Sequence, residues 1–303
     1  MRIVRARHRV LVQGITGKQG SFWTERMQAY GTNVVGGVNP KKAGIVHCGV
    51  PVYGSAKEAM DSDGGFDASV LFIPPPGVKD AALEAIEAGA RNLCILTEHI
   101  PVQDVMHVVA AAAEAGCVVT GPNTAGSVTV GECFLGFMPA FNERIFRKGT
   151  VGAISRSGSL GTLICQNVVS AGFGLSAFIG IGGDPIVGTT TREALEALDR
   201  FEGTEAVVIV GEIGGTMEEE AAEYAATMSK PVFAFIAGGA SPAGRKMGHA
   251  GAIVSGGKGT YQSKRKALEA AGVTVLDTPS HVGDALKGAL IHSVIPAVTL
   301  PSL

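Results

Sequence analysis

The fold is decided by an apolar run that passes directly into a glycine-rich turn, VLVQGITGKQG at residues 10–20. The apolar, largely β-branched residues predict a buried strand, and Gly14, Gly17 and Gly20 then recur at every third position before a predicted helix. In an open parallel sheet such a turn lies at the carboxyl end of the strand, where helix N–H groups favour a phosphate. We therefore expect a phosphate-bearing nucleotide here. Because the spacing is G-x-x-G-x-x-G and not G-x-G-x-x-G, a turn whose glycines serve packing alone is the alternative.

Short apolar strands and amphipathic helices alternate along the whole chain, which is the pattern of βα units that form parallel sheets. In the first half we predict strands at Arg9–Gln13, Asn33–Val38, Ala68–Ile73, Asn92–Leu96 and Cys117–Gly121, with helices at Ser21–Tyr30, Val78–Ala88 and Val102–Ala115. The pattern lapses at residues 123–150 and resumes with strands at Val151–Ile154, Leu175–Ile179, Ala206–Val210, Val232–Ile236, Ala252–Val254 and Val273–Leu276 and helices at Leu160–Ser170, Thr191–Phe201, Glu218–Met228 and Tyr261–Ala271. We expect two doubly wound α/β domains, at 1–122 and 151–303, joined by a connecting segment at 123–150.

Composition narrows the class of protein. The 303 residues carry 25 Lys+Arg and 27 Asp+Glu, a net charge of −2, which argues against nucleic acid or an anionic membrane as the main partner. With 46% hydrophobic and 17% charged residues, the chain has few enough charges to suggest buried sheets or a subunit interface. No apolar run is long enough to span a bilayer. The five cysteines form no C-x-x-C pair, and the basic start precedes too short an apolar run for a signal sequence, so we expect the cytoplasm.

The residues after the second predicted strand help to choose the nucleotide. A nicotinamide dinucleotide site normally has an acid there to hold the ribose hydroxyls, but residues 38–42 read VNPKK. Lys41 and Lys42 favour a ribose that carries an extra phosphate, as in coenzyme A or NADP. Two solvated loop lysines are the alternative.

A second strand-to-helix turn occurs at residues 155–161, SRSGSLG. Ser157 or Ser159 is a suitable N-cap, and the amides behind it would make a second anion site. A single helix end binds a phosphate weakly, so further donors are needed.

His249 is the residue that most resembles a reactive group. It lies in GRKMGHAGA, residues 244–252, where small flanking residues allow close approach and Arg245 and Lys246 add positive charge. Glu212 closes a buried-looking strand, and a carboxylate there can orient an imidazole. A structural histidine and a solvated loop acid are the alternatives. No metal-ligand spacing is found, and Gly256–Thr260 lacks the glycine that a Walker loop requires, so an ATP site is expected on another chain.

Taken together, these motifs closely resemble the α subunit of succinyl-CoA synthetase, the ADP- or GDP-forming succinate–CoA ligase. The resemblance covers nearly the whole chain, through residues 13–17, 30–32, 35–38, 121–123, 155–158, 180–185, 211–215 and 248–252. It implies an N-terminal Rossmann-like domain that binds coenzyme A, and a flavodoxin-like ligase domain. It also implies a partner, an ATP-grasp β subunit that holds ATP or GTP with Mg, in an αβ or α2β2 assembly.

The resemblance further implies a phosphoryl relay. The triphosphate phosphorylates His249, the phosphoryl group passes to a small carboxylic acid, and the thiol of coenzyme A attacks the acyl phosphate. Glu212 would be the partner of the histidine, and Ser157, Gly158 and Ser159 would cradle the phosphate. The contacts to coenzyme A would come from Thr16, Gly17, Lys18, Gln19, Lys42, Leu96, Thr97 and Glu98.

Two departures from the family motifs concern the acid. The family reads SGTLTY where residues 157–162 read SGSLGT, so Thr162 replaces a tyrosine. It reads PNCPG where residues 122–126 read PNTAG, which changes Thr124 and Ala125 beside Asn123. Losing a ring and a phenol hydroxyl opens space and removes a donor, so we expect an acid other than succinate, or a broader range of acids.

Two other functions fit the same pattern. Paired Rossmann-like domains with Lys41 and Lys42 also fit an NADP-dependent oxidoreductase. A non-catalytic subunit that only binds coenzyme A is the second alternative, against which the retention of both His249 and Glu212 weighs.

Overall fold

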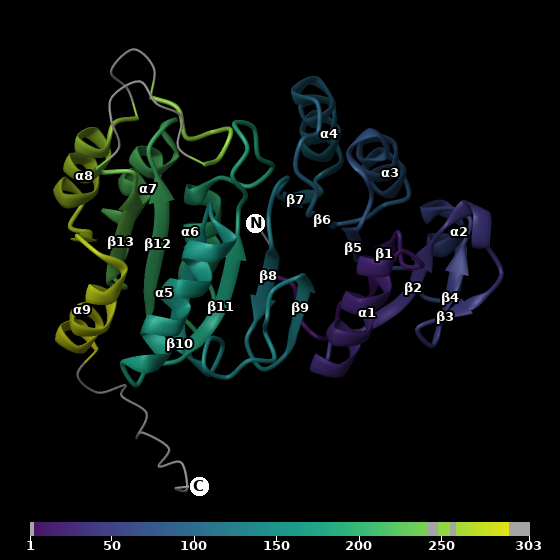
Figure 1. Cartoon of the computed structure of the whole chain (residues 1–303), viewed down its shortest axis with the longest axis horizontal. Coiled ribbons are helices and arrows are strands. Elements are labelled where there is room, and N and C mark those ends of the chain that lie inside the picture. Colours follow the sequence, from purple (N-terminus) through teal and green to yellow (C-terminus); the bar gives the residue numbers. More distant parts are fainter. Residues whose placement is uncertain (1–2, 241–247, 255–258, 291–303) are drawn as a thin grey trace, which may run out of the picture.

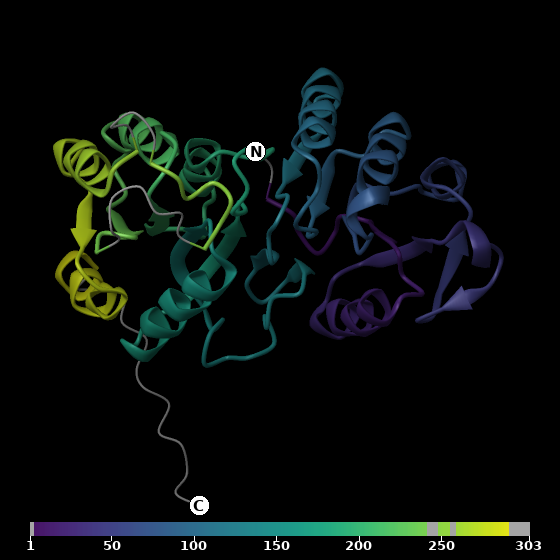
Figure 2. The ribbon, with the colours of Figure 1, turned by 45° about the horizontal axis from the view of Figure 1, so that its top comes forward.

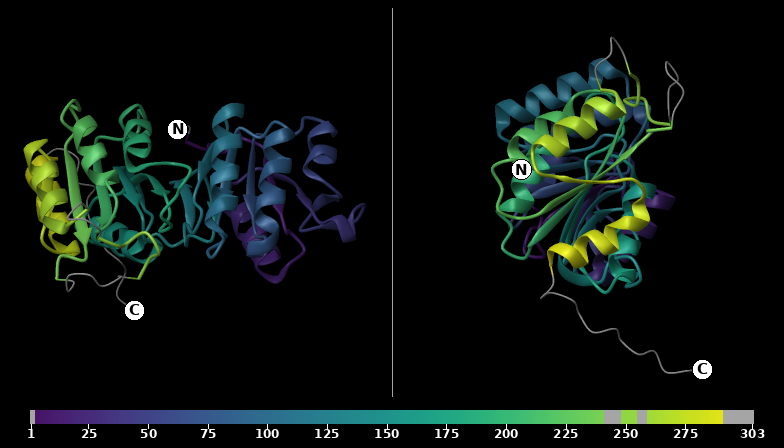
Figure 3. Two further views of the ribbon diagram at one scale, coloured as in Figure 1. Left: turned by 90° about the horizontal axis from the view of Figure 1, so that it is seen from above. Right: turned by 90° about the vertical axis from the view of Figure 1, so that its left-hand side faces the viewer.

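The computed structural model describes residues 3–240, 248–254 and 259–290. In this part of the chain two sheets of seven strands lie side by side, each with helices packed on it (Figure 1). Seen from above, the two sheet-and-helix units follow one another along the long axis of the molecule (Figure 3). Among the described residues, no helix combines the length and the apolar character that crossing a bilayer requires.

The first sheet is built around the strand that precedes the glycine-rich turn. Its order is β3-β4-β2-β1-β5-β6-β7, with β3 antiparallel to β4 and the other pairs parallel. The strands are β1 (Val10–Gln13), β2 (Val34–Val38), β3 (Val46–His47), β4 (Val50–Tyr53), β5 (Ala68–Leu71), β6 (Asn92–Ile95) and β7 (Val118–Thr120), and the helices are α1 (Lys18–Tyr30), α2 (Ala56–Asp61), α3 (Pro75–Glu87) and α4 (Val102–Ala115). Leaving out β3, this is the strand order of a Rossmann fold.

The second sheet has the order β14-β13-β12-β10-β11-β8-β9. The strands are β8 (Gly126–Thr129), β9 (Cys133–Gly136), β10 (Lys148–Ser155), β11 (Leu175–Gly180), β12 (Ala206–Glu212), β13 (Val232–Ala237) and β14 (Thr274–Leu276), and the helices are α5 (Gly158–Ser170), α6 (Thr191–Asp199), α7 (Met217–Ala225), α8 (Tyr261–Ala270) and α9 (Val282–Ala289). Strands β10 to β14 are parallel in the flavodoxin order, with α6, α7 and α8 on one face and α5 and α9 on the other (Figure 2). The predicted fold class is confirmed.

Two local predictions differ from the structure. The predicted strand at Ala252–Val254 is wrong: these residues form a loop, because Ala252 and Ile253 donate to the nearby carbonyls of His249 and Gly251, and β13 pairs directly with β14. Residues 123–150, expected to connect the domains, supply the antiparallel hairpin β8–β9 at the edge of the second sheet. Its strands are short, with Gly126 and Gly136 at positive φ, so the hydrophobic pattern hardly reveals them.

This hairpin joins the two sheets. Thr32, after α1, donates its hydroxyl to the carbonyl of Phe134 in β9 at 2.8 Å. Trp23 and Tyr30 of α1 pack edge-on against the Phe134 ring, with centroids 6.4 and 5.5 Å apart. One apolar cluster therefore contains buried residues from both sheets, and the two carboxyl-terminal sheet edges have a fixed relation.

Candidate active site

The site lies where the strand order of the second sheet reverses, between β10 and β12. These strands pair in parallel register, with Ser155 opposite Val210, so both end at the same edge of the sheet. Beyond β10 the chain turns at Ser157 into α5, and β12 ends at Glu212. Crevices at such reversals are where open α/β sheets bind ligands.

His249 reaches this edge from the loop before α8. Its Nδ1 lies 2.7 Å from Oε2 of Glu212, whose side chain is 8% exposed against 28% for the histidine. The hydrogen bond to the carboxylate raises the pKa of His249 above its ordinary value, while partial burial acts in the opposite direction. Nε2 has no hydrogen-bond partner among the residues that the structure describes, so the ring presents one nitrogen for reaction.

Two glycines allow the histidine loop to pack so closely. A Cβ on Gly183 would lie 2.5 Å from Cγ of His249, and one on Gly251 would lie 2.5 Å from Nη2 of Arg156. The backbone N–H of Gly251 donates to the carbonyl of Gly183 at 3.1 Å, which ties the loop to the segment after β11. The ring position is thus set by backbone contacts on both sides.

The start of α5 faces the same cavity. Ser157 caps the helix by accepting from the N–H of Leu160 at 3.4 Å, and its hydroxyl lies 3.3 Å from that of Ser159. A cavity of about 310 Å³ is lined by Ser157, Ser159, Leu160, Glu212, Ile213, Ala237, Gly238, Gly248, His249 and Ala252. The structure therefore brings the histidine, its carboxylate and the helix start together. Arg245 and Lys246, predicted to add charge here, lie outside the described residues.

A buried ionic cluster supports Glu212 from behind. Oε1 of Glu218, at the start of α7, accepts the backbone N–H of Glu212 at 3.2 Å. Lys264 of α8 has a fully buried side chain, and its Nζ donates to Glu218 at 2.5 Å, to Glu219 at 2.8 Å and to the carbonyl of Gly215 at 3.0 Å. Through its bond to Gly215, Lys264 holds the turn that follows β12. The histidine loop packs directly against this turn, because a Cβ on Gly214 would lie 2.4 Å from the carbonyl oxygen of Gly251.

The residues predicted to bind the nucleotide gather at the corresponding edge of the first sheet. Gly17, Lys18 and Gln19 are exposed at the start of α1, and the hydroxyl of Thr16 accepts from Nδ2 of Asn39 at 2.5 Å. Lys42 is exposed in the short 3-10 turn at Pro40–Lys42, and α1 begins after Gly17 without a side-chain cap on its first N–H groups. This edge can therefore hold a phosphate.

Three further predicted residues follow β6. Thr97 donates its hydroxyl to the carbonyl of Ile73 at 2.6 Å, and Glu98 is exposed. Leu96 is only 8% exposed and belongs to the shared apolar cluster. Its side chain therefore packs in the core, and a ligand could reach Leu96 only through its backbone.

A short segment links the two edges. The backbone N–H of Asn123 donates to the carbonyl of Thr97 at 2.9 Å, its Nδ2 donates to Asp184 at 2.9 Å, and its own carbonyl accepts from Gly183. The next residues are buried against the second domain, with the Thr124 hydroxyl donating to the carbonyl of Gly180 at 2.5 Å. This segment therefore links the first-domain edge to Gly183, which in turn contacts Gly251 of the histidine loop.

The other residues predicted to contact an acid lie around α5. The Thr162 hydroxyl donates to the carbonyl of Gly158 at 2.7 Å, within its own helix. Ala125 lies against the start of this helix, since a Cβ on Gly158 would be 3.0 Å from the Ala125 methyl group. Both residues thus lie beside the helix start, where their size limits the space for an acid. Neither offers it a free side-chain donor, because the Thr162 hydroxyl is already used and Ala125 has none.

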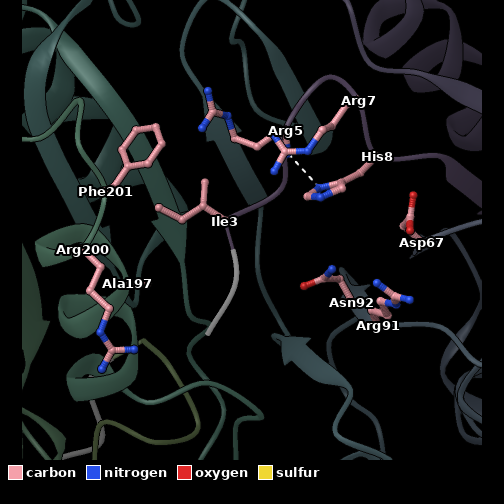
Figure 4. A pocket seen from close by; sticks show the side chains of 10 residues that line it. All are labelled: Ile3, Arg5, Arg7, His8, Asp67, Arg91, Asn92, Ala197, Arg200 and Phe201. Carbon is pink, nitrogen blue, oxygen red and sulfur yellow. Dashed lines mark hydrogen bonds between the residues drawn. The ribbon is translucent and has the colours of Figure 1, made fainter.

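A cavity of about 660 Å³ lies away from this chemistry (Figure 4). Asn92 begins β6 and Asp67 immediately precedes β5, so the cavity lies at the amino ends of the strands. Two of its arginines are already paired, Arg5 with Glu132 and Arg200 with Glu196. It therefore has no part in the arrangement around His249.

Two residues of the site were given no role by the sequence pattern. Arg156 contacts Glu212, and Asp184 binds Asn123. The signal for Arg156 was its place between the end of a strand and an N-cap. For Asp184 the signal was the small residues that precede it in the sequence. Neither signal shows which partner the side chain contacts.

Two family models match this chain, one in each of its two domains. Residues 6–99 match the model of the CoA binding domain, and residues 154–274 match the CoA-ligase model. The chain is 50% identical over 282 residues to the succinate–CoA ligase [ADP-forming] subunit alpha of Methanothermobacter thermautotrophicus, covering 93% of this chain and 94% of the relative. It is 45% identical over 284 residues to a subunit of the ADP-forming sulfoacetate-CoA ligase of Bilophila wadsworthia, covering 93% and 97%.

The solved structure of ATP citrate lyase from Methanothrix soehngenii, in complex with citrate and coenzyme A, has a similar fold. The TM-score is 0.86 at 22% identity, over 99% of this chain and 53% of that one. This chain thus spans about half the length of the lyase chain, and the likeness concerns the fold alone.

The hydrogen bond between His249 and Glu212 predicts a pH dependence. Because the folded-state pKa of His249 is raised above 6.5, the stability that this pair contributes is fully present below pH 6.5 and is lost as the pH rises through the folded-state value. An NMR titration of the His249 ring should show a midpoint above 6.5, and Glu212→Gln should lower it. A midpoint at or below 6.5 in the unaltered chain would contradict this.

The buried cluster behind Glu212 predicts a large loss of stability on removing its cation. Lys264→Met leaves Glu218 buried without a counter-charge and should lower the free energy of unfolding by about 3–5 kcal/mol, measured by urea denaturation. The control is Lys57→Met, since Lys57 is 77% exposed in its pair with Asp61 and should cost less than about 1 kcal/mol. Equal losses for the two variants would argue against a structural role for the cluster.

Proposed function

Because this chain belongs to the succinate–CoA ligase α-subunit family, we propose that it is the α subunit of an NDP-forming acid–CoA ligase. The enzyme makes an acyl-CoA from a carboxylic acid, coenzyme A and ATP or GTP, through a phosphohistidine and an acyl phosphate. The observation that supports this best is the pairing of His249 with Glu212 at 2.7 Å, beside a capped helix start and on a shared cavity. A relay needs such a group, which can accept a phosphoryl group from one side and pass it on.

Each step of the relay exchanges one bond to phosphorus or carbon for another. The lone pair of Nε2 of His249 forms a bond to the terminal phosphorus of the triphosphate as the bond to the diphosphate breaks. A carboxylate oxygen of the acid then displaces the imidazole from phosphorus. The thiolate of coenzyme A attacks the acyl carbon, phosphate leaves, and the thioester remains.

In this proposal Glu212 is the partner that fixes the reactive nitrogen. It accepts a hydrogen bond from the Nδ1–H group, so the lone pair stays on Nε2, and its carboxylate stabilises the positive charge that the ring gains when Nε2 binds phosphorus. Ser157, Gly158 and Ser159 supply N–H and hydroxyl donors at the start of α5. Phosphoryl transfer depends mainly on such positioning and charge neutralisation.

Coenzyme A is proposed to bind at the first-domain edge. The N–H of Lys18 would donate to its pyrophosphate beside Gly17, and Lys42 would bind the phosphate on its ribose. Thr16 and Gln19 complete the turn, while Leu96, Thr97 and Glu98 follow β6, where Thr97 accepts a hydrogen bond from Asn123. The thiol would then approach the acid along that segment.

The nucleotide is proposed to bind to another subunit. As an α subunit, this chain works with a β partner, which we propose has an ATP-grasp fold and holds ATP or GTP with Mg. The cavity beside His249 opens at the edge where that partner would present its triphosphate. The assembly would be αβ or α2β2.

The acid is proposed to be short and to carry a second negatively charged group. Succinate and sulfoacetate, the acids in the names of the two relatives, share this chemistry. On this chain, Asn123, Thr124, Ala125 and Thr162 would border the acid. Because Thr162 is smaller than the tyrosine of the family motif, we propose a range of acids wider than succinate.

The relay predicts a labelled α chain. Incubation with the β partner and ATP labelled in its terminal phosphate should give one acid-labile, base-stable phosphate per α chain, which is absent in His249→Ala. Glu212→Gln should slow labelling at least tenfold, because the carboxylate that fixes Nδ1 is lost. His281→Ala is the control and should label like the unaltered chain. Label that survives in His249→Ala would move the chemistry elsewhere.

The proposed acid range predicts a pattern of turnover. Succinate and sulfoacetate should both be converted, whereas butyrate, which matches succinate in length but lacks the second charge, should be at least tenfold slower. Thr162→Tyr should narrow the range toward succinate, while Leu163→Ala, at an exposed neighbouring position of α5, should not change it. A clear preference of the unaltered enzyme for succinate, or rapid turnover of butyrate, would contradict the proposal.

A further inference from the structure

Arg156 is a buried cation in direct contact with the candidate active site. It lies between the end of β10 and the N-cap of α5, and its side chain is 2% exposed. Its Nη2 lies 3.3 Å from Oε1 of Glu212, while the other oxygen of that carboxylate contacts Nδ1 of His249. Glu212 is therefore held between a fixed positive charge and the imidazole.

The contact is an ion pair without full hydrogen bonding. Nε and Nη1 of Arg156 and Oε1 of Glu212 are buried and have no hydrogen-bond partner within the described part of the chain. A buried guanidinium with unpaired donors is costly, so packing alone is a poor reason for an arginine here. Its position is nevertheless fixed, because its backbone N–H donates to the carbonyl of Val210 at 3.2 Å and its guanidinium packs against Gly251 of the histidine loop.

We propose that Arg156 is a positioning residue for the phosphoryl transfer: it holds Glu212 as a carboxylate directed at Nδ1, and so keeps Nε2 of His249 as the free nitrogen. This inference rests on the function proposed above. Arg156 touches neither phosphate nor acid in this role. It acts through Glu212.

The physical reason is competition for one proton. A carboxylate buried beside an imidazole stabilises the imidazolium, and a doubly protonated ring has no lone pair with which to attack phosphorus. A guanidinium at 3.3 Å stabilises the carboxylate and repels the imidazolium, so it opposes the second protonation of the ring. In agreement, Glu212 raises the pKa of His249 whereas Arg156 acts to lower it.

The other groups near the ring do not replace this effect. Asp184, on the loop after β11, also raises the pKa of His249. Ser157 and Ser159, on the α5 side, are neutral. Behind Glu212, Lys264 of α8 is already paired with Glu218 and Glu219 of α7. Among the described residues around the ring, Arg156 is thus the cation that contacts Glu212 without another carboxylate partner.

The same charge matters during the transfer. As the N–P bond forms and the electron pair of the breaking P–O bond leaves with the diphosphate, the Nδ1 proton stays on the ring, which becomes positive. Arg156 keeps Glu212 from taking that proton outright, because protonating the carboxylate would leave the guanidinium buried without a counter-charge. When the phosphoryl group moves to the acid, the electron pair of the N–P bond returns to Nε2 with the proton still on Nδ1.

The test is the pH dependence of His249 phosphorylation in the αβ enzyme, measured by rapid quench with labelled MgATP. Arg156→Met should move the acid limb of the profile to higher pH by about one unit, which is a tenfold loss of rate below the limb. Arg156→Lys keeps a charge and should restore most of the profile. Arg147→Met is the control, because Arg147 is a partly buried arginine that donates to the carbonyls of Val169 and Phe173, and it should leave the limb in place.

A uniform loss of rate at every pH in Arg156→Met, with the limb unmoved, would mean a merely structural role and would overturn the proposal. A second measurement does not depend on phosphorylation or on the methionine variant. NMR titration of His249 in the full α chain should give a higher pKa in Arg156→Gln than in the unaltered chain, and equal values would overturn the proposal. If no phosphate appears on His249 in the unaltered enzyme, the proposed function fails, while the titration still decides the role of Arg156.

Discussion

The hydrogen bond between Nδ1 of His249 and Glu212 is the interaction on which the candidate site depends. It fixes the ring and decides which nitrogen is open, and it requires both residues to reach one edge of the second sheet. Parallel strands provide this edge, since β10 and β12 end together where the strand order reverses. Glu218 then accepts a hydrogen bond from the backbone N–H of Glu212, and Arg156 contacts the second oxygen of the Glu212 carboxylate.

The position of the first domain follows from a second constraint, a run of backbone contacts between the two sheet edges. Thr97 leads to Asn123, Asn123 to Gly183, and Gly183 to Gly251 in the histidine loop. The β8–β9 hairpin packs α1 against the second sheet, so this run does not have to hold the domains together by itself. This run of contacts therefore joins Thr97, on the edge where the nucleotide is proposed to bind, to the loop that carries His249.

Much of this could be predicted from the sequence, because strand ends carry the chemistry. The glycine turn after β1 and the alternation of strands and helices indicated the fold class, and the strand ends pointed to Ser157 and Glu212. The β8–β9 hairpin could not be predicted, since its strands are short and contain glycines that interrupt the pattern. Ala252–Val254 is apolar like a strand, but hydrophobic character does not reveal whether a neighbouring strand is available to pair with it. The place of Arg156 between a strand end and an N-cap did not reveal its role, because that role lies in a contact with a residue far along the chain.

The central claim is that Glu212 occupies Nδ1 and leaves Nε2 to carry the phosphoryl group. The most direct measurement is the ³¹P NMR spectrum of the phosphorylated enzyme, recorded under denaturing alkaline conditions, because phosphate on the two ring nitrogens gives separate resonances. We predict the resonance of histidine phosphorylated at Nε2. A resonance from phosphate on Nδ1, or no histidine-bound phosphate in an active enzyme, would contradict the claim.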